Sequence, residues 1–398
     1  MLQGKTVLLG VTGGIAAYKM PNVARMLKKL HCNVHVLMTQ NATNFITATT
    51  FETLTGNKCL IDTFDRNFEF SVEHVALAKQ ADLVLLAPVT ANVIGKIANG
   101  IADDMLTTTV MACPCKVLVA PAMNHNMYMN PIVQDNIEKL KKFNYEIIPP
   151  VVGMLANGDI GTGKLPSEEV LVEYVIRELA HEKDMAGMKV LVTAGPTQEA
   201  IDPVRYITNH STGKMGYALA KMAMLRGAEV TLVTGPTALE PPMFVNTVNV
   251  VSAKDMYDAV TSVAKEQDVI IKAAAVADYR PSQVSDEKIK KTDGEAAISL
   301  ERTDDILATL GKDKGKTFLC GFSMETEHML ENSKAKLKKK NVDMIVANNL
   351  KVAGAGFGTD TNVLTIITED DAKELALMSK EAAADEVLTA IMERRGLQ

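Results

Sequence analysis

Two side chains in the first half of the chain have the chemistry of an acid–base site. Ser71 is a typical N-cap for a helix over residues 72–79, which places His74 at the third helical position. The positive helix end there disfavours the imidazolium, so a neutral His74 is suited to accept a proton near pH 7. The alternative is a surface histidine in an ordinary first turn. Asn124, in PAMNHNMY, offers a donor and an acceptor and suits recognition of a carboxylate beside an amide.

Glycine and small polar residues at the ends of predicted strands indicate a second kind of chemistry. Thr12-Gly13-Gly14 joins a strand to a helix, where glycine lets a phosphate approach the backbone and the helix N-terminus favours its charge. The spacing is not GxGxxG, so an ordinary tight turn stays the alternative. The apolar run Leu83–Ala87 is followed by APVTAN and then NGIADDMLTTT, and open α/β sheets bind ligands at such strand ends.

The second half of the chain carries the residues of an anion site. NHSTGKMG, residues 209–216, is a polar glycine-rich loop that runs into a helix, and Asp278 ends the run AAAVAD. Lysines cluster in EKIKK around Lys288 and in KAKLKKK, where Lys336 and Lys340 share one helix face. Two such clusters in a net-acidic chain favour a polyphosphate site over a solvated face, with Asp278 as a ligand for bridging Mg²⁺. The P-loop pattern GxxxxGK[ST] is absent.

The elements that would position these residues are strands and helices that alternate along the chain. Apolar runs of strand length include 6–11, 34–38, 83–87, 117–120, 145–148, 188–193, 229–234, 269–273, 318–322 and 344–347. Helical patterns over 15–30, 131–142, 167–179, 215–226 and 380–394 lie among them, with Ser167 and Ser379 as N-caps. This alternation predicts an α/β fold of open, Rossmann-like parallel sheets with helices on both faces. The glycine-rich segment 151–165 is predicted to be a mobile loop.

The opening pattern recurs in the middle of the chain, because GMKVLVTAGPT from Gly187 mirrors GKTVLLGVTGG from Gly4. With 398 residues, the chain has room for two or three domains. We predict two α/β domains, residues 1–182 and 188–398.

Composition excludes several classes of protein. The hydrophobic fraction of 47% and charged fraction of 23% are those of a globular protein, and the net charge of −6 argues against general nucleic-acid binding. The strongest apolar runs are far shorter than the roughly 20 residues of a membrane span. Five cysteines are too few and too irregular for a disulfide framework, and Cys113-Pro114-Cys115 lacks the spacing of a zinc knuckle or thioredoxin motif. We therefore expect a reduced, cytoplasmic protein that binds neither membranes nor nucleic acid.

Several of these motifs resemble known enzyme families. GVTGGIAAYK, His74, APVTANVIGKIANGIADDMLTTT and PAMNHNMY resemble the flavin-dependent cysteine decarboxylases. TAGPTQEAIDPVRYITNHSTGKMG, AAVADYRP, EKIKK and GFSMET resemble the bacterial phosphopantothenate–cysteine ligases. The match covers nearly the whole chain in the domain order of the bifunctional coenzyme A biosynthesis family, which implies a flavodoxin-like first domain and a ligase second domain.

For the second half, the resemblance implies joining of 4′-phosphopantothenate to cysteine. CTP activates the carboxylate as an acyl-cytidylate with release of pyrophosphate, and the cysteine amine then attacks. The resemblance assigns formation of the acyl-cytidylate to Lys288 and its handling to Asn209. The implied CTP contacts are Asp278, Lys288, Asp304, Asp305, Ile306, Leu307, Phe322, Lys336 and Lys340. The physics agrees, since lysines offset the triphosphate charge and Phe322 packs against a ribose or base.

For the first half, the resemblance implies an FMN-dependent decarboxylase that forms 4′-phosphopantetheine. Flavin oxidises the cysteinyl thiol, CO₂ leaves, and the reduced flavin then reduces the resulting ene-thiol(ate). His74 matches the base and Asn124 the contact to the substrate carboxylate. The positions implied to contact FMN are Gly13, Thr39, Thr90, Asn92, Asp104 and Thr107. The family also implies a homo-oligomer, a dodecamer of decarboxylase trimers and ligase dimers.

One position departs from the family pattern. In GMLANGDIGTGK the family commonly has Cys where this chain has Asn157, and that Cys is the acid of the final reduction. A neutral amide is not a practical proton donor near pH 7. Three interpretations stay open: another group or water delivers the proton, the ene-thiol is released unreduced, or the residue was engineered.

Two other functions compete with this interpretation. A nicotinamide-dependent dehydrogenase shares the opening strand–helix–strand pattern, but GxGxxG is missing and Met38-Thr39 stands where an acidic residue should end the second strand. A non-catalytic binding protein that regulates partners is the other. The presence of His74, Asn124, Asn209 and Lys288 argues against it.

Overall fold

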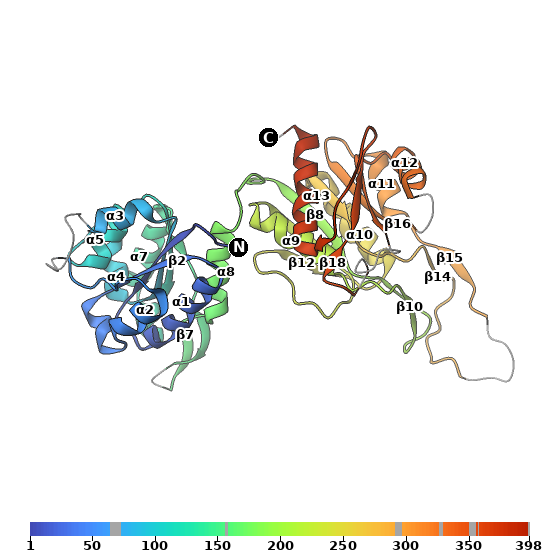
Figure 1. Cartoon of the computed structure of the whole chain (residues 1–398). Helices are drawn as coiled ribbons and strands as arrows, with labels where there is room; N and C mark the ends of the chain where they lie inside the picture. The colour runs from blue at the N-terminus through green and yellow to red at the C-terminus, as the bar shows by residue number, and fades with distance from the viewer. Residues whose placement is uncertain are drawn as a thin grey trace. The chain divides into compact units, whose positions relative to one another are not determined.

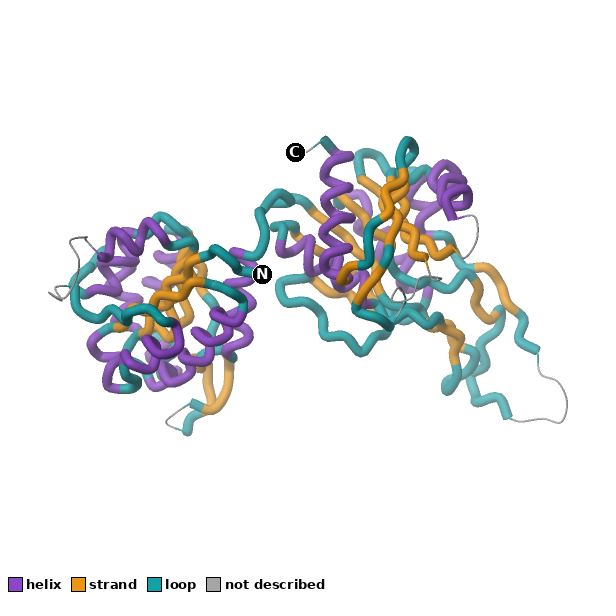
Figure 2. Tube along the Cα trace, viewed as in Figure 1, coloured by secondary structure: helices purple, strands orange, loops and turns teal. Residues whose placement is uncertain are grey.

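The chain divides into two compact units, Met1–His181 and Glu182–Gln398 (Figure 1). The structure is a computed structural model, and it describes residues 1–63, 73–155, 158–290, 297–325, 329–349, 356 and 358–396. Asn157 and the predicted cap Ser71 therefore lie outside the described residues. In each unit the strands of a sheet lie among helices (Figure 2), so the predicted α/β class is confirmed.

The first unit is built on a five-stranded parallel sheet with the order β2-β1-β3-β4-β5. Its strands are β1 (Thr6–Val11), β2 (Asn33–Met38), β3 (Leu83–Val89), β4 (Lys116–Pro121) and β5 (Glu146–Ile147). β1 and β3 are buried along their whole length, as expected for central strands covered on both faces. This order is flavodoxin-like, and its switch point for ligand binding lies between the carboxyl ends of β1 and β3.

The helical segments of the first unit follow the predicted pattern with one correction. They are η1 (Ile15–Lys19), α1 (Met20–Lys29), η2 (Gln40–Asn44), α2 (Ala48–Thr55), α3 (Glu73–Gln80), α4 (Ala91–Ala98), α5 (Met105–Ala112), α6 (His125–Tyr128), α7 (Pro131–Lys142) and α8 (Glu168–Leu179). The single helix predicted over 15–30 is a 3₁₀ segment followed by α1. Pro21 lies in the first turn of α1, because proline has no N–H to donate and is tolerated only at a helix start.

The glycine-rich segment predicted to be a mobile loop contains a β-hairpin instead. β6 (Val151–Met154) pairs antiparallel with β7 (Ile160–Lys164). Gly163 has φ +141°, and a Cβ there would lie 2.2 Å from the carbonyl oxygen of Met123. A Cβ on Gly161 would lie 2.8 Å from Cγ of His125. These two glycines therefore permit close backbone approach, which sequence alone does not distinguish from flexibility.

The second unit has an eight-stranded sheet with the order β12-β11-β8-β13-β16-β17-β19-β20. Its strands are β8 (Lys189–Ala194), β11 (Glu229–Thr234), β12 (Asn246–Asn249), β13 (Val269–Lys272), β16 (Phe318–Glu325), β17 (Met344–Asn349), β19 (Leu364–Ile367) and β20 (Ala372–Glu374). The first six in the spatial order are parallel, but β19 and β20 pair antiparallel at one edge. The sheet is thus mixed, where sequence predicted a purely parallel one.

Helices and small ribbons complete the second unit. The helical segments are α9 (Lys214–Leu225), α10 (Ala253–Val263), η3 (Ala264–Glu266), α11 (Ile306–Lys312), α12 (Met329–Lys340) and α13 (Lys380–Arg395). The two-stranded pairs are β9 (Gln198–Ala200) with β10 (Tyr206–Thr208), β14 (Tyr279–Pro281) with β15 (Leu300–Arg302), and β18 (Thr361–Asn362) with β21 (Met378–Ser379). The predicted caps are confirmed, since Ser167 accepts from the N–H of Val170 at 3.4 Å and Ser379 from that of Ala382 at 3.1 Å.

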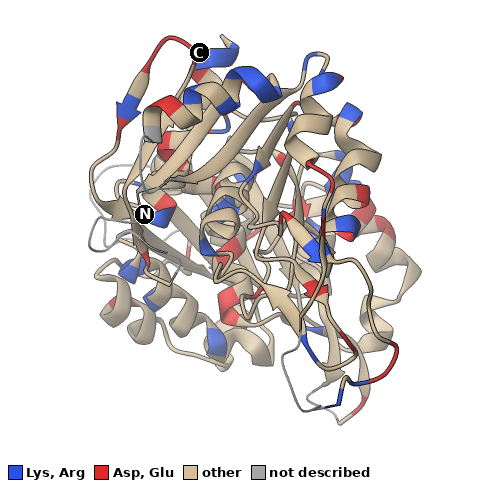
Figure 3. Ribbon diagram, turned by 90° about the vertical axis from the view of Figure 1, so that its right-hand side faces the viewer, with Lys and Arg blue, Asp and Glu red and all other residues tan. Residues whose placement is uncertain are grey.

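The placement of charged residues and the polarity of the helices are those expected of two globular α/β units. Acidic and basic residues are interspersed along the ribbon in Figure 3. Within the part of the chain that the structure describes, every helix is too short or too polar to cross a bilayer.

Candidate functional site

The carboxyl ends of β1 and β3 are joined by one buried threonine. The Thr12 hydroxyl donates to the carbonyl of Pro88 at 2.8 Å and accepts from the N–H of Thr90 at 3.0 Å. Next to it, a Cβ on Gly13 would lie 2.6 Å from Cβ of Asn41, so this position admits no side chain without a shift of the backbone. The switch point is therefore a tight, glycine-lined loop with Thr90 at its far side, as a phosphate-binding loop requires.

Thr39 lies beside this loop, and the surroundings of its hydroxyl are unusual for a buried polar group. Its N–H donates to the carbonyl of Val11 at 3.0 Å, which ties the end of β2 to the end of β1. Its side-chain oxygen is buried and has no hydrogen-bond partner among the residues that the structure describes. A buried hydroxyl without a partner is costly and calls for an explanation, such as a ligand that supplies the missing hydrogen bond.

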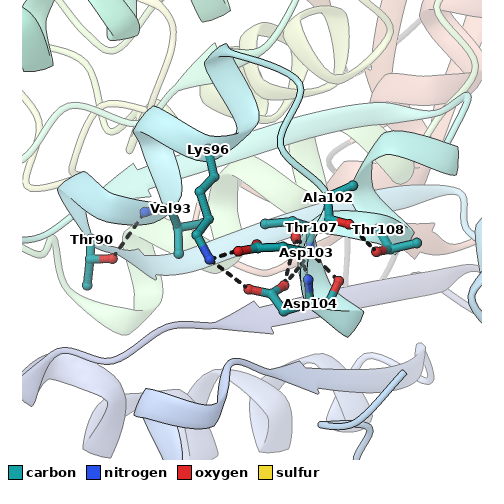
Figure 4. A network of polar contacts seen from close by, with 8 residues as sticks. All are labelled: Thr90, Val93, Lys96, Ala102, Asp103, Asp104, Thr107 and Thr108. Carbon is teal, nitrogen blue, oxygen red and sulfur yellow. Dashed lines mark hydrogen bonds and ion pairs between the residues drawn. The ribbon is translucent and has the colours of Figure 1, made fainter. Parts of the chain in front are cut away.

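A polar network fixes the loop between α4 and α5 (Figure 4). Asp104 caps α5 by accepting from the N–H and the hydroxyl of Thr107, both at 2.8 Å. Lys96 of α4 holds Asp103 at 2.7 Å and Asp104 at 3.6 Å. Thr90 caps α4 by accepting from the N–H of Val93 at 3.4 Å. The predicted contacts Thr90, Asp104 and Thr107 are thus held in place by helix capping, and Asn92 lies exposed in the first turn of α4.

The hairpin β6–β7 is fastened beside Asn124. The N–H of Met123 donates to the carbonyl of Gly163 at 3.0 Å, and Nδ1 of His125 accepts from the N–H of Thr162 at 3.2 Å. Oδ1 of Asn124 accepts from the N–H of Asn126 at 2.9 Å as the N-cap of α6. The Nδ2 donors are the part of this amide that the cap does not use, and they suit a carboxylate.

His74 occupies the second described position of α3 and is half-buried. α3 packs against α5, the helix whose N-terminus carries Asp104 and Thr107. The helix that carries His74 is thus in contact with the helix that carries Asp104 and Thr107. The predicted N-cap precedes the described residues, so the structure does not test it.

In the second unit, a cavity of about 340 Å³ opens at the carboxyl ends of β13, β16 and β17. It brings together five of the residues selected from sequence: Asn209, Asp278, Phe322, Lys336 and Lys340. Nδ2 of Asn209 donates to the carbonyl of Ala275 at 2.9 Å, which fixes the loop before α9 against the end of β13. Loop, strand end and helix α12 therefore contribute amide, carboxylate, aromatic and ammonium groups to one cavity.

Two family models together span nearly the whole chain. Residues 1–180 match the family model described as Flavoprotein, and residues 185–394 match the DNA/pantothenate metabolism flavoprotein C-terminal domain. The chain is 47% identical over 395 residues to the coenzyme A biosynthesis bifunctional protein CoaBC of Bacillus subtilis, covering 98% of this chain and 97% of that protein. The Escherichia coli protein of the same name is 40% identical over 397 residues, covering 99% and 98%.

The chain belongs to the bifunctional coenzyme A biosynthesis family. A crystal structure of the C-terminal domain of CoaBC covers 54% of this chain and 98% of its own length, at 46% identity and a TM-score of 0.47.

Three lysines of this family member line the ligase-half cavity without having been selected from sequence. They are Lys214, Lys272 and Lys380. Burial and the neighbouring charge of Lys340 lower the pKa of Lys272, and burial and Lys214 lower that of Lys380. The sequence does indicate Lys272, because it ends the apolar strand VIIK and burial of a charged group there costs free energy. Together with Lys336 and Lys340, they bring five lysine side chains to one cavity.

Asp304, Asp305, Ile306 and Leu307 are outside the lining of this cavity, although Asp305 contacts one of its lysines. The Asp305 carboxylate caps α11 and pairs with Lys340 at 2.9 Å. Burial favours a raised pKa for Asp305, but the hydrogen bonds from Lys340 and the Ala308 N–H, together with the charges of Lys340 and Lys272, outweigh it, so the pKa is lowered. The side chains of Ile306 and Leu307 are buried in the hydrophobic core, so these two positions can offer a ligand only their backbone. Asp304 is exposed.

Lys288 is outside the described lining of the cavity. It lies exposed on the segment between β14 and β15. The adjacent Ile289 anchors this segment, because its N–H donates to the buried carboxylate of Asp202 at 3.1 Å and its carbonyl accepts from Arg205 at 3.0 Å. Asp202 and Arg205 are thus positioning residues for the Lys288 segment, a role that their sequence positions did not indicate.

Proposed function

We propose that this chain makes 4′-phosphopantetheine from 4′-phosphopantothenate, cysteine and CTP, with residues 188–398 as the ligase and residues 1–182 as an FMN-dependent decarboxylase. The observation that carries the proposal is identity over nearly the full length with proteins named as bifunctional in coenzyme A biosynthesis. The separate sites at the two sheets support it, because each joins the residue types that one of the two reactions requires.

In the ligase reaction, an oxygen of the phosphopantothenate carboxylate attacks the α-phosphorus of CTP and pyrophosphate leaves. The lysines of the cavity offset the charge of the triphosphate, and Phe322 packs against the nucleoside. The cysteine amine then attacks the acyl carbon, and CMP leaves. Asn209 holds the acyl-cytidylate, and Lys288 stabilises charge while it forms.

Mg²⁺ accompanies CTP in this proposal. Among the described residues, no group of three or more His, Cys, Asp or Glu side chains is arranged to hold a metal ion. Asp278 lines the cavity and offers one carboxylate. A Mg²⁺ ion bound there would take its other ligands from phosphate oxygens and water, which is its usual manner of binding in nucleotide sites.

In the decarboxylase reaction, the residues around the switch point would hold FMN. Gly13 and Thr90 would bind its phosphate, Thr39 would supply a hydroxyl, and Asn92, Asp104 and Thr107 would complete the contacts. Bound FMN supplies oxidation of the cysteinyl thiol and the later return of two electrons. His74 accepts a proton from the substrate, and the Nδ2 donors of Asn124 bind the carboxylate that leaves as CO₂.

The buried hydroxyl of Thr39 provides a test of the FMN site. We expect Thr39→Val to weaken FMN binding roughly fivefold, because it removes one hydrogen bond worth about 1 kcal/mol while keeping the shape. Quenching of flavin fluorescence on titration with apoprotein measures this. Thr109→Val is the matched control, since Thr109 is equally buried but its hydroxyl already donates to the carbonyl of Met105 at 2.7 Å. Equal FMN affinities in both variants would remove Thr39 from the site.

The whole proposal is tested by supplying phosphopantothenate, cysteine, CTP and Mg²⁺ to the full chain loaded with FMN. Mass spectrometry should find 4′-phosphopantetheine, CMP and pyrophosphate, and omission of FMN should stop the reaction at phosphopantothenoylcysteine. Failure to form phosphopantothenoylcysteine would contradict the ligase assignment. Its formation with no loss of CO₂ in the presence of FMN would contradict the decarboxylase assignment.

We also propose a cytoplasmic homo-oligomer, a dodecamer of decarboxylase trimers and ligase dimers. Exposed apolar side chains support an interface on the first unit, including Val152, Met154 and Ile160 on the hairpin. Native mass spectrometry of the same sample measures the assembly, and a monomer at micromolar concentration would contradict this part.

A further inference from the structure

Asp202 is a buried carboxylate whose two oxygens have separate partners. Oδ1 accepts from the N–H groups of Val204 at 2.9 Å and Arg205 at 2.8 Å, so it closes the loop of residues 201–205 between β9 and β10. Oδ2 accepts from Nε of Arg205 at 3.0 Å and from the N–H of Ile289 at 3.1 Å. One oxygen therefore serves its own loop, and the other reaches the segment that carries Lys288.

Hydrogen bonds attach this anchored segment, residues 285–289, to the 201–205 loop on both sides of Lys288. The N–H of Ser285 donates to the carbonyl of Ile201 at 3.1 Å. The carbonyl of Ile289 accepts from Arg205 at 3.0 Å, in addition to the bond that its N–H makes. The Ile289 side chain is 46% exposed, so burial of apolar surface contributes little to the attachment. Because neighbouring Cα atoms are about 3.8 Å apart, fixing Ile289 also fixes the backbone of Lys288.

The 201–205 loop is itself connected to the wall of the ligase cavity through β9. Thr197, which precedes β9, donates its N–H to the carbonyl of Ala275 at 3.2 Å, and its hydroxyl accepts from the N–H of Ala277 at 3.0 Å. The same carbonyl of Ala275 accepts from Nδ2 of Asn209 at 2.9 Å, and Ala275 and Asn209 both line the cavity. A series of hydrogen bonds and one short strand therefore connects the cavity to the anchored segment.

The carboxylate of Asp202 is charged in the folded protein. The hydrogen bond from the Arg205 guanidinium, helped by the backbone N–H groups, holds the pKa of Asp202 well below its usual range, although burial acts in the opposite direction. Hydrogen bonds to a charged acceptor are roughly twice as strong as those between neutral groups. Such bonds suit a connection that has to hold a segment in one position.

We propose that Asp202 is a positioning residue for formation of the acyl-cytidylate and that it acts through Lys288. Its Oδ2 holds the backbone beside Lys288, so that the ammonium group is presented to the charge that develops on the reacting phosphate. A cation already held in place stabilises that charge without reorganisation during the reaction. The attack of the cysteine amine does not use Lys288, so that step is independent of Asp202. This inference rests on the role proposed above for Lys288.

Asp202→Asn tests the connection because it keeps one oxygen and replaces the other. The amide oxygen still accepts from the N–H groups of Val204 and Arg205, whereas an NH₂ group takes the place of Oδ2 and cannot accept from Ile289. In the full chain, we expect single-turnover release of pyrophosphate to slow by on the order of 10- to 100-fold. The later step, measured by adding cysteine after the acyl-cytidylate has formed, should keep its native rate.

Asp268→Asn is the matched control. Asp268 also accepts a backbone N–H, from Lys189 at 2.9 Å, but it precedes β13 and lies at the opposite end of that strand from the cavity. Both steps should keep their native rates in this variant. Equal slowing in Asp268→Asn and Asp202→Asn would attribute the effect to lost charge alone and would contradict a specific role for Asp202.

Combination with Lys288→Ala distinguishes positioning from a general structural effect. If Asp202 acts only through Lys288, the double variant should release pyrophosphate as slowly as Lys288→Ala alone. Multiplied effects in the double variant, or equal slowing of both steps in Asp202→Asn, would overturn the inference. A slow Lys288→Ala chain beside a native-rate Asp202→Asn chain would overturn the inference alone. Native rates in Lys288→Ala would refute the role proposed for Lys288 and this inference with it.

Hydrogen exchange of the native chain tests the anchor without any substitution. The amide of Ile289 donates to Asp202, whereas the amide of Lys288 makes no hydrogen bond to any residue that the structure describes. We expect the Ile289 amide to exchange at least about tenfold more slowly than that of Lys288. Fragmentation that resolves single amides by mass spectrometry measures both rates. Equal rates would show that the anchor is not made in solution, whether or not the variants fold.

Discussion

Replacement of His74 by Asn is expected to lower the rate of CO₂ release by about 10²- to 10⁴-fold, the usual loss for a positioned general base. Asparagine has a similar size but accepts no proton near pH 7. CTP-dependent ligation should continue unchanged, because the cavity with Asn209 and the lysines belongs to the other compact unit. Single-turnover CO₂ release from phosphopantothenoylcysteine and steady-state pyrophosphate release measure the two activities on the same preparation.

Asn157→Cys is the contrasting variant for the same half-reaction. Decarboxylation needs a base but no acid at position 157, so CO₂ release should be unchanged in this variant. Only the later reduction should change, seen as faster reoxidation of the flavin, because a cysteine restores the acid that the family commonly has there. If native and Asn157→Cys chains reoxidise flavin equally fast and give the same fully reduced product, another residue or water delivers the proton.

Two outcomes would change the interpretation of the His74→Asn variant. Loss of ligation together with decarboxylation in His74→Asn would indicate a damaged fold rather than a lost base. Native rates of CO₂ release in a folded, FMN-loaded His74→Asn chain would show that the base lies elsewhere.

Asn209→Asp is expected to slow formation of phosphopantothenoylcysteine by on the order of 10²-fold or more. The native Nδ2 donates to the carbonyl of Ala275 at 2.9 Å, and a carboxylate cannot donate this bond. The change also places a negative charge in the cavity proposed to hold a triphosphate and its acyl ester. We expect the loss mainly in conversion of the acyl-cytidylate, so this intermediate should accumulate and be visible by mass spectrometry after quenching.

Two comparison variants make this result specific. Asn249→Asp changes the net charge equally at an exposed position of β12 and should leave ligation unchanged. Lys288→Ala should slow formation of the acyl-cytidylate instead of its conversion, so no intermediate should accumulate. Ligation at the native rate in Asn209→Asp would show that Asn209 plays no part in the reaction.

Sequence patterns predicted the limits of a helix or strand correctly where the residues that determine those limits are neighbours in the chain. The limits of β1 and α7 were predicted to the residue, because an apolar run between polar residues marks a buried strand and Pro131 is favoured in the first turn of a helix. The caps Ser167 and Ser379 were predicted equally well, since a cap bonds to an N–H three residues away.

Partly buried and glycine-rich segments were predicted less well because their structure depends on distant neighbours. Gly161 and Gly163 indicated a loop, yet they allow the hairpin β6–β7 to approach Met123 and His125. The antiparallel edge of the second sheet was missed for a similar reason. β19 is as apolar as a central strand, and its direction is set by pairing with β17 rather than by its own residues.

Sequence by itself determined the fold class and the family, because hydrophobic patterns and short motifs are made of residues that are close together in the chain. Only the tertiary structure brought Lys214, Lys272 and Lys380 into one cavity with Lys336 and Lys340. It also left the Thr39 hydroxyl buried without a partner in the described part of the chain, and it placed Lys288 on a segment anchored by Asp202. The physical reason is the same in each case: burial, pKa and hydrogen-bond partners depend on groups brought together by strand order, often from positions far apart in the chain.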